Sequence, residues 1–209
     1  MLWYNEKHMG KKPKIRVIVF DLGGVVVHGG YLGFINHYCG PCLTPLGKRK
    51  IADLEHRVNL GLLSEREFYR LLHEVFGLHL TVREIRRQII RKMRADRTLL
   101  KFIRTLEPTK LALFTNSIGH MAVDVLHSRR VPAKKLFDRV FVSSRIHFAK
   151  PDRDAYRFVL RSMRVKPSEA LMVDDRPVNI RGARAAGMRA ILFRNTRQFR
   201  RALKRYELV

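Results

Sequence analysis

The stretch KIRVIVFDLGGVVVH, residues 14–28, decides the fold of this chain. Its apolar run Ile15–Phe20, interrupted by a single arginine, ends at one acid, Asp21, and two glycines follow at Gly23 and Gly24. A short β-branched run bounded by glycine predicts a buried strand of a parallel sheet. Open α/β sheets bind ligands at the carboxyl ends of their strands, and glycines there let the backbone turn sharply and approach something small. We therefore interpret Asp21 as the reactive centre.

From residue 98 onward, patterns typical of strands and of helices alternate along the chain. The predicted strands are Lys110–Phe114, Arg139–Val142, Ala170–Val173 and Arg189–Phe193. The predicted helices are Leu99–Leu106, His120–Ser128, Asp154–Met163, Ile180–Ala186 and a basic terminal helix, Thr196–Tyr206. Strands that alternate with helices indicate an α/β protein with a doubly wound parallel sheet.

The segment between the first strand and this alternating region has a different pattern. Gly29–Gly47 is rich in glycine, proline and aromatic residues, whereas Lys48–Met93 is helical in its spacing. Ser64 with Glu67 and Thr81 with Glu84 match the capping box that opens a helix. We expect a small helical module inserted into the α/β core. The predicted division is a basic lead-in at 1–13, a core formed by 14–28 and 98–209, and the helical insert at 29–97.

Polar side chains follow the predicted strands at the points where those strands end. Asp21 follows the first strand, Thr115-Asn116-Ser117 a second and Asp174-Asp175 a third, while Lys150 precedes a proline and a helix. In a parallel sheet all carboxyl ends share one edge, so these groups can converge. Each element alone also has a structural explanation, as a turn or helix cap, and the functional interpretation depends on all four in this order.

This set of residues suits phosphoryl chemistry. Carboxylates from two strands suit Mg²⁺, which prefers oxygen ligands, and a hydroxyl, backbone amides and a lysine suit phosphate oxygens. An aspartate that attacks a phosphoryl group needs the metal, because otherwise one anion repels the other. The set predicts phosphoryl transfer through an aspartyl-phosphate.

The four segments together resemble the motifs of the haloacid dehalogenase (HAD) superfamily. FDLGGVVV (20–27) resembles its first motif, LFTNS (113–117) its second, AKPDRDAY (149–156) its third and MVDDRPVNIRGARAAGM (172–188) its fourth. The insert resembles the small helical cap of the family, and GLLSEREF (61–68) is similar to cap sequence of the branch that includes sugar-phosphate phosphatases. The resemblance covers about residues 14–195. It implies a Rossmannoid core with an α-helical cap, and a Mg²⁺-dependent phosphatase of a small phosphorylated metabolite.

The resemblance also implies a role for each residue of the set. Asp21 is expected to be the nucleophile, Thr115 and the Asn116 backbone to hold phosphate, and Lys150 to bridge the charges of nucleophile and phosphate. Asp175 is expected to bind Mg²⁺ together with Asp21, with Asp174 beside it as a second or indirect ligand.

One position departs from the pattern of the family. Its usual first motif is D-x-D, and the second aspartate is the general acid/base, but here that position is Gly23. The Gly23 carbonyl can still face the metal, whereas the missing carboxylate cannot protonate a leaving group. General acid–base help is worth about 10²–10⁴-fold. Three outcomes stay open: a slow enzyme, substrates with good leaving groups such as acyl phosphates or sugar 1-phosphates, or phosphate binding without turnover. His28 is either a substitute acid/base or a solvent-facing histidine at a strand end.

The charge balance raises a second hypothesis. Lys and Arg outnumber Asp and Glu by 43 to 18, which gives a net charge of +25 and a pI near 11.1. Such a balance favours polyanionic partners, or it reflects a generally basic surface that binds nucleic acid non-specifically. The row of bases from Arg83 to Arg94 is either a solvated helix face or a phosphate-facing one. The alternative function is a catalytically weak HAD-fold protein that binds RNA or a ribonucleoprotein. Removal of a halide needs no metal, so the paired acids Asp174 and Asp175 disfavour it.

Two further features bear on compartment. Cys39 and Cys42 form C-G-P-C, which matches a dithiol redox motif but lacks a strong strand before it, so we interpret them as incidental thiols in a reducing compartment. A zinc site would need two more ligands, and His37 alone is close. No apolar run approaches the roughly 20 residues that span a bilayer, and the start lacks the apolar region of a secretory signal. We expect a cytoplasmic protein without a membrane segment.

Overall fold

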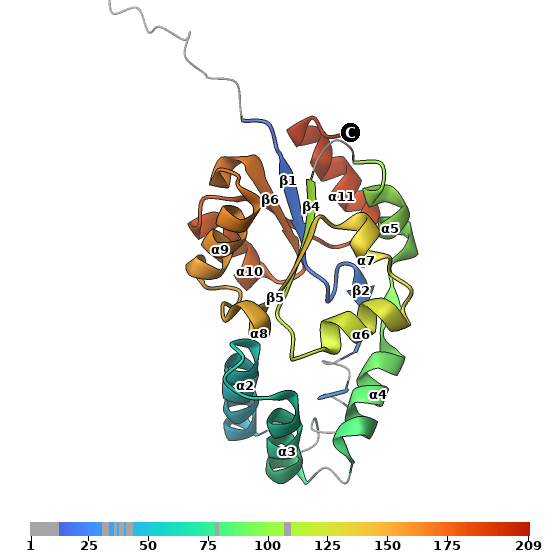
Figure 1. Ribbon diagram of the computed structural model, residues 1–209, viewed down its shortest axis with the longest axis vertical. Coiled ribbons are helices and arrows are strands. Elements are labelled where there is room, and N and C mark those ends of the chain that lie inside the picture. Colours follow the sequence, from blue (N-terminus) through green and yellow to red (C-terminus); the bar gives the residue numbers. More distant parts are fainter. Residues whose placement is uncertain are drawn as a thin grey trace, which may run out of the picture.

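The core of the computed structural model is a five-stranded parallel sheet (Figure 1). The strands are β1 (Val17–Phe20), β4 (Lys110–Thr115), β5 (Arg139–Val142), β6 (Ala170–Asp174) and β7 (Arg189–Leu192), in the order β5-β4-β1-β6-β7. The structure describes residues 13–30, 34, 35, 37, 40, 44–77, 80–106 and 110–209. The predicted parallel α/β sheet is therefore confirmed.

The central strand explains why the polar groups meet. β1 lies between β4 and β6, and its last residue, Phe20, is in register with Leu113 on one side and Val173 on the other. The residue that follows β1, Asp21, therefore leaves the sheet between the ends of β4 and β6. The backbone N–H of Asp21 still donates to the Val173 carbonyl at 2.9 Å, which fixes where its side chain begins.

Helices cover both faces of the sheet, as the burial of all four residues of β1 requires. Val17 and Val19 pack with α9 (Arg153–Met163) and α10 (Pro177–Ala185) on one face. Ile18 and Phe20 pack on the other face, which is covered by α5 (Arg97–Ile103), α6 (Met121–Ser128) and α11 (Thr196–Leu203). Shorter elements connect these layers: α7 (Ala133–Leu136), α8 (Ser143–Ile146), and the 3₁₀ turns η2 (Pro167–Glu169) and η3 (Lys204–Tyr206).

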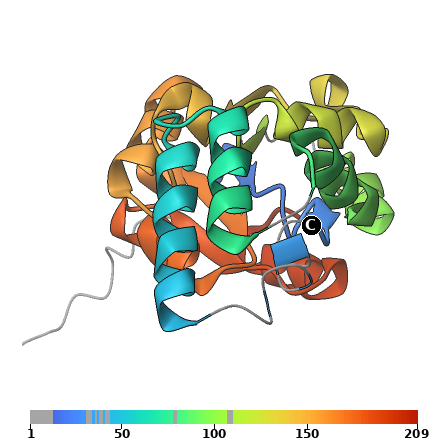
Figure 2. The ribbon, with the colours of Figure 1, turned by 90° about the horizontal axis from the view of Figure 1, so that it is seen from below.

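Three helices of the insert lie at the carboxyl end of the sheet: α2 (Pro45–Asn59), α3 (Glu65–Phe76) and α4 (Val82–Lys92) (Figures 1 and 2). Both expected capping boxes form, with Ser64 and Glu67 at the start of α3 and Thr81 and Glu84 at the start of α4. Each box satisfies two backbone N–H groups that the first helical turn leaves free. The assignment of residues 29–97 as a cap domain stays a prediction.

Several predicted element bounds need correction. The helix expected to carry Arg94 ends at Lys92, because Met93 adopts an extended backbone and Arg94 enters a short ribbon. In that ribbon β3 (Arg94–Ala95) pairs antiparallel with β2 (Val27–His28), which closes the two ends of the insert against each other. The segment between the strand Arg139–Val142 and Lys150 contains α8, and the terminal helix changes to 3₁₀ geometry after Leu203.

Other expectations shift by a few residues or fall outside the described part of the chain. The first strand begins at Val17 rather than Ile15, and Asp96 caps α5 so that this helix starts at Arg97. Cys39, Cys42 and most of the lead-in at 1–13 lie outside the described residues. Within the described ranges, no helix combines the length and the apolar composition needed to cross a bilayer.

Candidate active site

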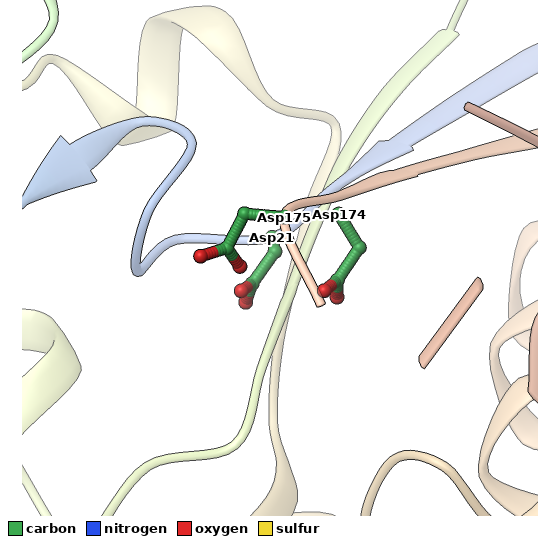
Figure 3. A group of neighbouring side chains, drawn as sticks. All are labelled: Asp21, Asp174 and Asp175. Carbon is green, nitrogen blue, oxygen red and sulfur yellow. The ribbon is translucent and has the colours of Figure 1, made fainter. Parts of the chain in front are cut away.

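Three carboxylates meet where β1 and β6 end (Figure 3). Asp21, Asp174 and Asp175 each offer one oxygen such that these oxygens all lie within 4.8 Å of one another. Asp21 and Asp174 are buried, whereas Asp175 is exposed. The predicted convergence of the ends of these two strands therefore occurs, and the cluster opens to solvent on the Asp175 side.

One buried lysine offsets part of this negative charge. The Lys150 Nζ lies 2.8 Å from Asp21 Oδ1 and 2.7 Å from Asp174 Oδ2, and the residue is only 4% exposed. Burial disfavours its ammonium form, but the two carboxylates outweigh burial and hold the pKa of Lys150 above its usual value. The same ammonium lies over the Phe114 ring, 5.4 Å from its centroid. Lys150 is therefore a fixed positive charge between the ends of β1 and β6.

The side chain of Asn116 holds the backbone of Lys150 in place. Its Nδ2 donates to the Lys150 carbonyl at 2.8 Å, and its Oδ1 accepts from the Lys150 N–H at 2.9 Å. These two hydrogen bonds connect the loop after β4 to the loop before α9. Thr115 is buried at the end of β4, beside Asn116. The phosphate-holding role predicted for Asn116 concerns its backbone. The structure shows a separate contact of its side chain, which positions the Lys150 backbone.

The next loop residue, Ser117, is anchored from a neighbouring strand. Its backbone N–H donates to the hydroxyl of Ser143 at 3.1 Å, and Ser143 is fully buried at the end of β5. Asn116 and Ser117, which follow Thr115 at the end of β4, thus have fixed contacts with two other segments. The role of Ser143 had no signal in the sequence, since a serine after a short strand is common in loops.

Asp174 is surrounded by donors. Besides Lys150, the Nδ2 of Asn179 lies 3.0 and 3.1 Å from its two oxygens, and the Arg176 backbone N–H donates to it at 2.9 Å. Tyr156 in turn donates its hydroxyl to the Asn179 carbonyl at 2.7 Å. Both oxygens of Asp174 are therefore engaged within the protein, which favours an indirect role, orienting Lys150, over direct metal binding.

Asp175 differs from Asp174 in its exposure and in its hydrogen bonding. Among the described residues, no side chain donates a hydrogen bond to its carboxylate, and it faces the glycine turn after β1. Gly24 has φ +77°, and a Cβ there would overlap the Asp175 carboxylate, so only glycine fits. Gly23 is exposed, and a Cβ there would meet nothing within 4 Å. The turn therefore approaches Asp175 at Gly24 and leaves space at Gly23.

The electrostatics of the cluster favour binding of a cation. Burial raises the pKa of Asp21 to about 6, against the lowering effect of Lys150, and Asp174 adds to the increase. Burial and then Asp174 also raise the pKa of Asp175. Carboxyls whose negative form is disfavoured by burial and by one another gain from a bound cation. Oxygen ligands of this kind suit a hard divalent ion.

Most of the residues proposed from the sequence are brought together, with one exception. The candidate His28 lies in β2, is exposed, and places its Nε2 3.2 Å from Asp96 rather than at the three aspartates. The contact of Asn179 with Asp174 was missed as a site feature. A signal existed, because Asn179 stands five residues after Asp174 at the start of a helix.

Known phosphatases are similar to this chain over most of its length. The chain is 24% identical over 184 residues to the phosphorylated carbohydrates phosphatase of Thermotoga maritima, covering 85% of this chain and 84% of that protein. It is 26% identical over 199 residues to the D-ribitol-5-phosphate phosphatase of Bacteroides thetaiotaomicron, covering 90% and 97%. It is also 24% identical to drimenol cyclase drtB of Aspergillus calidoustus, but there the match spans 36% of that longer protein and 90% of this chain.

Solved structures agree with these relatives. An HAD-like family hydrolase from Porphyromonas gingivalis superimposes with a TM-score of 0.73 at 25% identity, covering 91% of this chain and 97% of that one. An HAD family enzyme from Bacteroides thetaiotaomicron, in complex with magnesium and inorganic phosphate, gives a TM-score of 0.71 at 18% identity, covering 87% and 96%. The family model for haloacid dehalogenase-like hydrolases matches residues 15–187. The chain therefore belongs to the haloacid dehalogenase-like hydrolases.

Proposed function

We propose that this hydrolase is a Mg²⁺-dependent phosphatase that acts on a small phosphorylated metabolite through an aspartyl-phosphate on Asp21. The observation that carries the proposal is the cluster of three carboxylates at the ends of β1 and β6, two of which, Asp21 and Asp174, contact Lys150. Two relatives support the substrate class, since their names record phosphatases of phosphorylated carbohydrates and of D-ribitol 5-phosphate. A structural neighbour that binds magnesium and inorganic phosphate supports the metal.

The residues present fit a magnesium ion. Asp21 and Asp175 supply carboxylate oxygens, and within the described chain no backbone N–H donates to the Gly23 carbonyl, which lies in an exposed turn. These three groups would hold the ion, while Asp174 would act through Lys150. Bound Mg²⁺ would offset the charge of a phosphate group beside Asp21.

The proposed reaction begins at the Asp21 carboxylate. One of its oxygens forms a bond to phosphorus, and the bond between phosphorus and the leaving oxygen breaks, with its electron pair remaining on that oxygen. Lys150, held in its charged form by two carboxylates, offsets negative charge on the transferring group. Water then attacks phosphorus, the aspartyl bond breaks, and inorganic phosphate leaves as the carboxylate is restored. Thr115 and the Asn116 backbone are proposed to hold the phosphate oxygens.

The substrate class follows from the residue that is absent. Gly23 has no carboxyl group, so within this site we find no equivalent acid to protonate the leaving oxygen. Substrates whose leaving groups need little protonation, such as acyl phosphates and sugar 1-phosphates, are therefore the favoured ones. The helices α2, α3 and α4 at the carboxyl end of the sheet are proposed to act as the cap that selects among them.

A phosphate-release screen tests this function. Purified protein is offered acyl, sugar, nucleotide and aryl phosphates, with Mg²⁺ or with a chelator. We expect release that needs Mg²⁺ and is fastest for good leaving groups. Asp21→Asn should abolish it while leaving the melting temperature near that of the wild type, because asparagine keeps the shape of the side chain. An unchanged rate in Asp21→Asn would show that Asp21 is not the nucleophile.

A further inference from the structure

The edge of the sheet opposite the active site carries a basic groove. A depression of about 600 Å³ is formed where β1 and β6 begin and α9 ends. Its lining includes five cationic residues: Arg16, Arg157, Arg161, Arg164 and Lys166. All five are exposed, while Leu160 and Val165 supply an apolar floor. The groove lies at the amino-terminal ends of the strands, so it is separated from Asp21 by the length of β1.

The charge of this groove is only partly neutralised within the protein. Its one lining acid, Glu169, already accepts the Lys166 backbone N–H at 2.8 Å and lies 3.5 Å from Arg16. Arg157 pairs with Asp154 on its own helix at 3.1 Å. In the described part of the chain, Arg161 and Arg164 form no ion pair with an acid. Their charges remain available to an outside anion.

A second basic depression continues this edge. About 410 Å³ in volume, it lies where β4 begins, and its lining includes Arg104, Lys110, Lys134 and Lys135. Its acid, Asp138, accepts the Leu111 backbone N–H at 2.8 Å. The two depressions lie on opposite faces of the sheet, since Leu160 lines one and Leu111 lines the other. Their lining residues are neighbours at the amino-terminal edge, where the Lys110 N–H donates to the Arg16 carbonyl at 3.1 Å. Five cations line the first depression and four line the second, and we call these nine residues the basic edge.

The row of bases from Arg83 to Arg94, which the sequence suggested as a phosphate-facing surface, includes one residue that joins helices within the protein. Arg86 on α4 contacts Glu65 of α3 and Asp124 of α6, so its charge is used to join the insert to the core. Arg87 and Arg91 on the same helix are exposed, and neither of them lines either of the two depressions. The basic edge, rather than α4, therefore combines cationic charge with a concave surface.

We propose that the basic edge binds the phosphate backbone of a nucleic acid, without reading its bases. Exposed cations in depressions on both sides of the amino-terminal edge match a ligand that passes over this edge and presents phosphates at regular intervals, whereas a single small anion would need only one of the depressions. Lysine and arginine contacts to phosphate position a nucleic acid but carry no sequence information. Because the edge lies opposite the aspartates, the bound strand leaves the catalytic cluster free.

The proposal is tested with a labelled single-stranded RNA whose binding to the full chain is followed by anisotropy over a salt series. If about four phosphates are neutralised, the logarithm of the affinity falls with the logarithm of salt with a slope of about −3. The double variant Arg161→Glu/Lys166→Glu should weaken binding about tenfold or more and make this slope shallower by about 1.4, because two phosphate contacts are lost. Arg161→Gln/Lys166→Gln replaces it if the glutamates prevent folding, as judged by circular dichroism.

The matched control is Arg87→Glu/Arg91→Glu on α4, which changes the net charge by the same amount. We expect this control to keep most of the RNA affinity. Equal losses in the two double variants would overturn the proposal, because binding would then follow total charge rather than the groove. Absence of RNA binding by the wild type at low salt, or binding to vesicles of anionic lipid but not to RNA, would overturn it as well.

Discussion

The carboxyl-terminal and amino-terminal edges of the central sheet differ in charge: the first carries buried carboxylates and the second carries exposed cations. At the carboxyl edge, Asp21 and Asp174 are buried and share one buried lysine through contacts of 2.8 and 2.7 Å. At the amino edge, cations such as Arg161 are exposed and have no acid partner within the described residues. Fixed buried charges suit chemistry that needs defined geometry, whereas exposed charges suit attraction of an extended anion. Substitutions at the two edges should therefore have different effects.

The largest effect is expected from removing Lys150. Lys150→Met leaves two buried carboxylates without their cation, so we expect phosphate release to fall to background and the free energy of unfolding to drop by about 3 kcal/mol. Denaturant unfolding and the phosphate assay measure both. Adding Asp174→Asn should recover part of the stability, because one unpaired charge is removed. Arg161→Glu at the other edge should change neither quantity appreciably. A fully stable Lys150→Met variant would contradict the account.

Gly23→Asp should increase the rate on substrates with poor leaving groups by about 10²-fold, because it restores an acid where the turn has space. The gain should be small for acyl phosphates, whose leaving groups need little protonation. Gly23→Asn is the matched control, since it has the same shape but no proton to give. Equal rates for the aspartate and asparagine variants would show that the missing acid does not limit the reaction.

The two neighbouring glycines should respond differently to alanine. Gly24→Ala forces Asp175 to move, and we expect Mg²⁺ affinity to fall by about tenfold. Gly23→Ala meets nothing within 4 Å and should change the affinity by less than about twofold. Calorimetric titration of each variant with Mg²⁺ measures this difference. Similar losses at both positions would argue that the turn, and not the position of Asp175, controls the metal.

The smallest effect is expected from pH. With its pKa raised to about 6, Asp21 in the metal-free protein is half protonated at that pH, and the proton competes with Mg²⁺. Mg²⁺ affinity should therefore increase with pH, being about twofold weaker at pH 6 than on the plateau above it. Titration at several pH values measures the curve, and in Asp21→Asn this dependence should be lost. A Mg²⁺ affinity that falls as pH rises through 6 would contradict the assignment.

Much of the sheet edge that carries the site was predictable from the sequence. The β-branched run before Asp21 and the run before Asp174 predicted two strands of one parallel sheet, whose ends share one edge. The structure shows that these two strands are neighbours. The capping residues Ser64 and Thr81 marked where α3 and α4 begin, because their chemistry is local. Features decided by short-range spacing were therefore predicted well.

Features that depend on contacts between distant segments of the chain were not predicted from the sequence. Pairing of Val27–His28 with Arg94–Ala95 joins residues far apart in the chain, and no local pattern distinguishes Arg94 from the helix before it. The spacing of Asn179 from Asp174 was readable in the sequence, but the contact itself depends on how the start of α10 lies against β6. The basic edge was hidden for the same reason, since its cations come from five separate segments.

The central claim, that Asp21 carries the phosphoryl group, is tested most directly by acid-quenching the wild type during turnover of an acyl phosphate with Mg²⁺ and mapping the label by mass spectrometry. The account predicts one phosphoryl group on Asp21, abundant because Gly23 cannot activate the water that removes it, and no label without Mg²⁺ or in Asp21→Asn. A label on another residue, or turnover by Asp21→Asn at the wild-type rate, would contradict it.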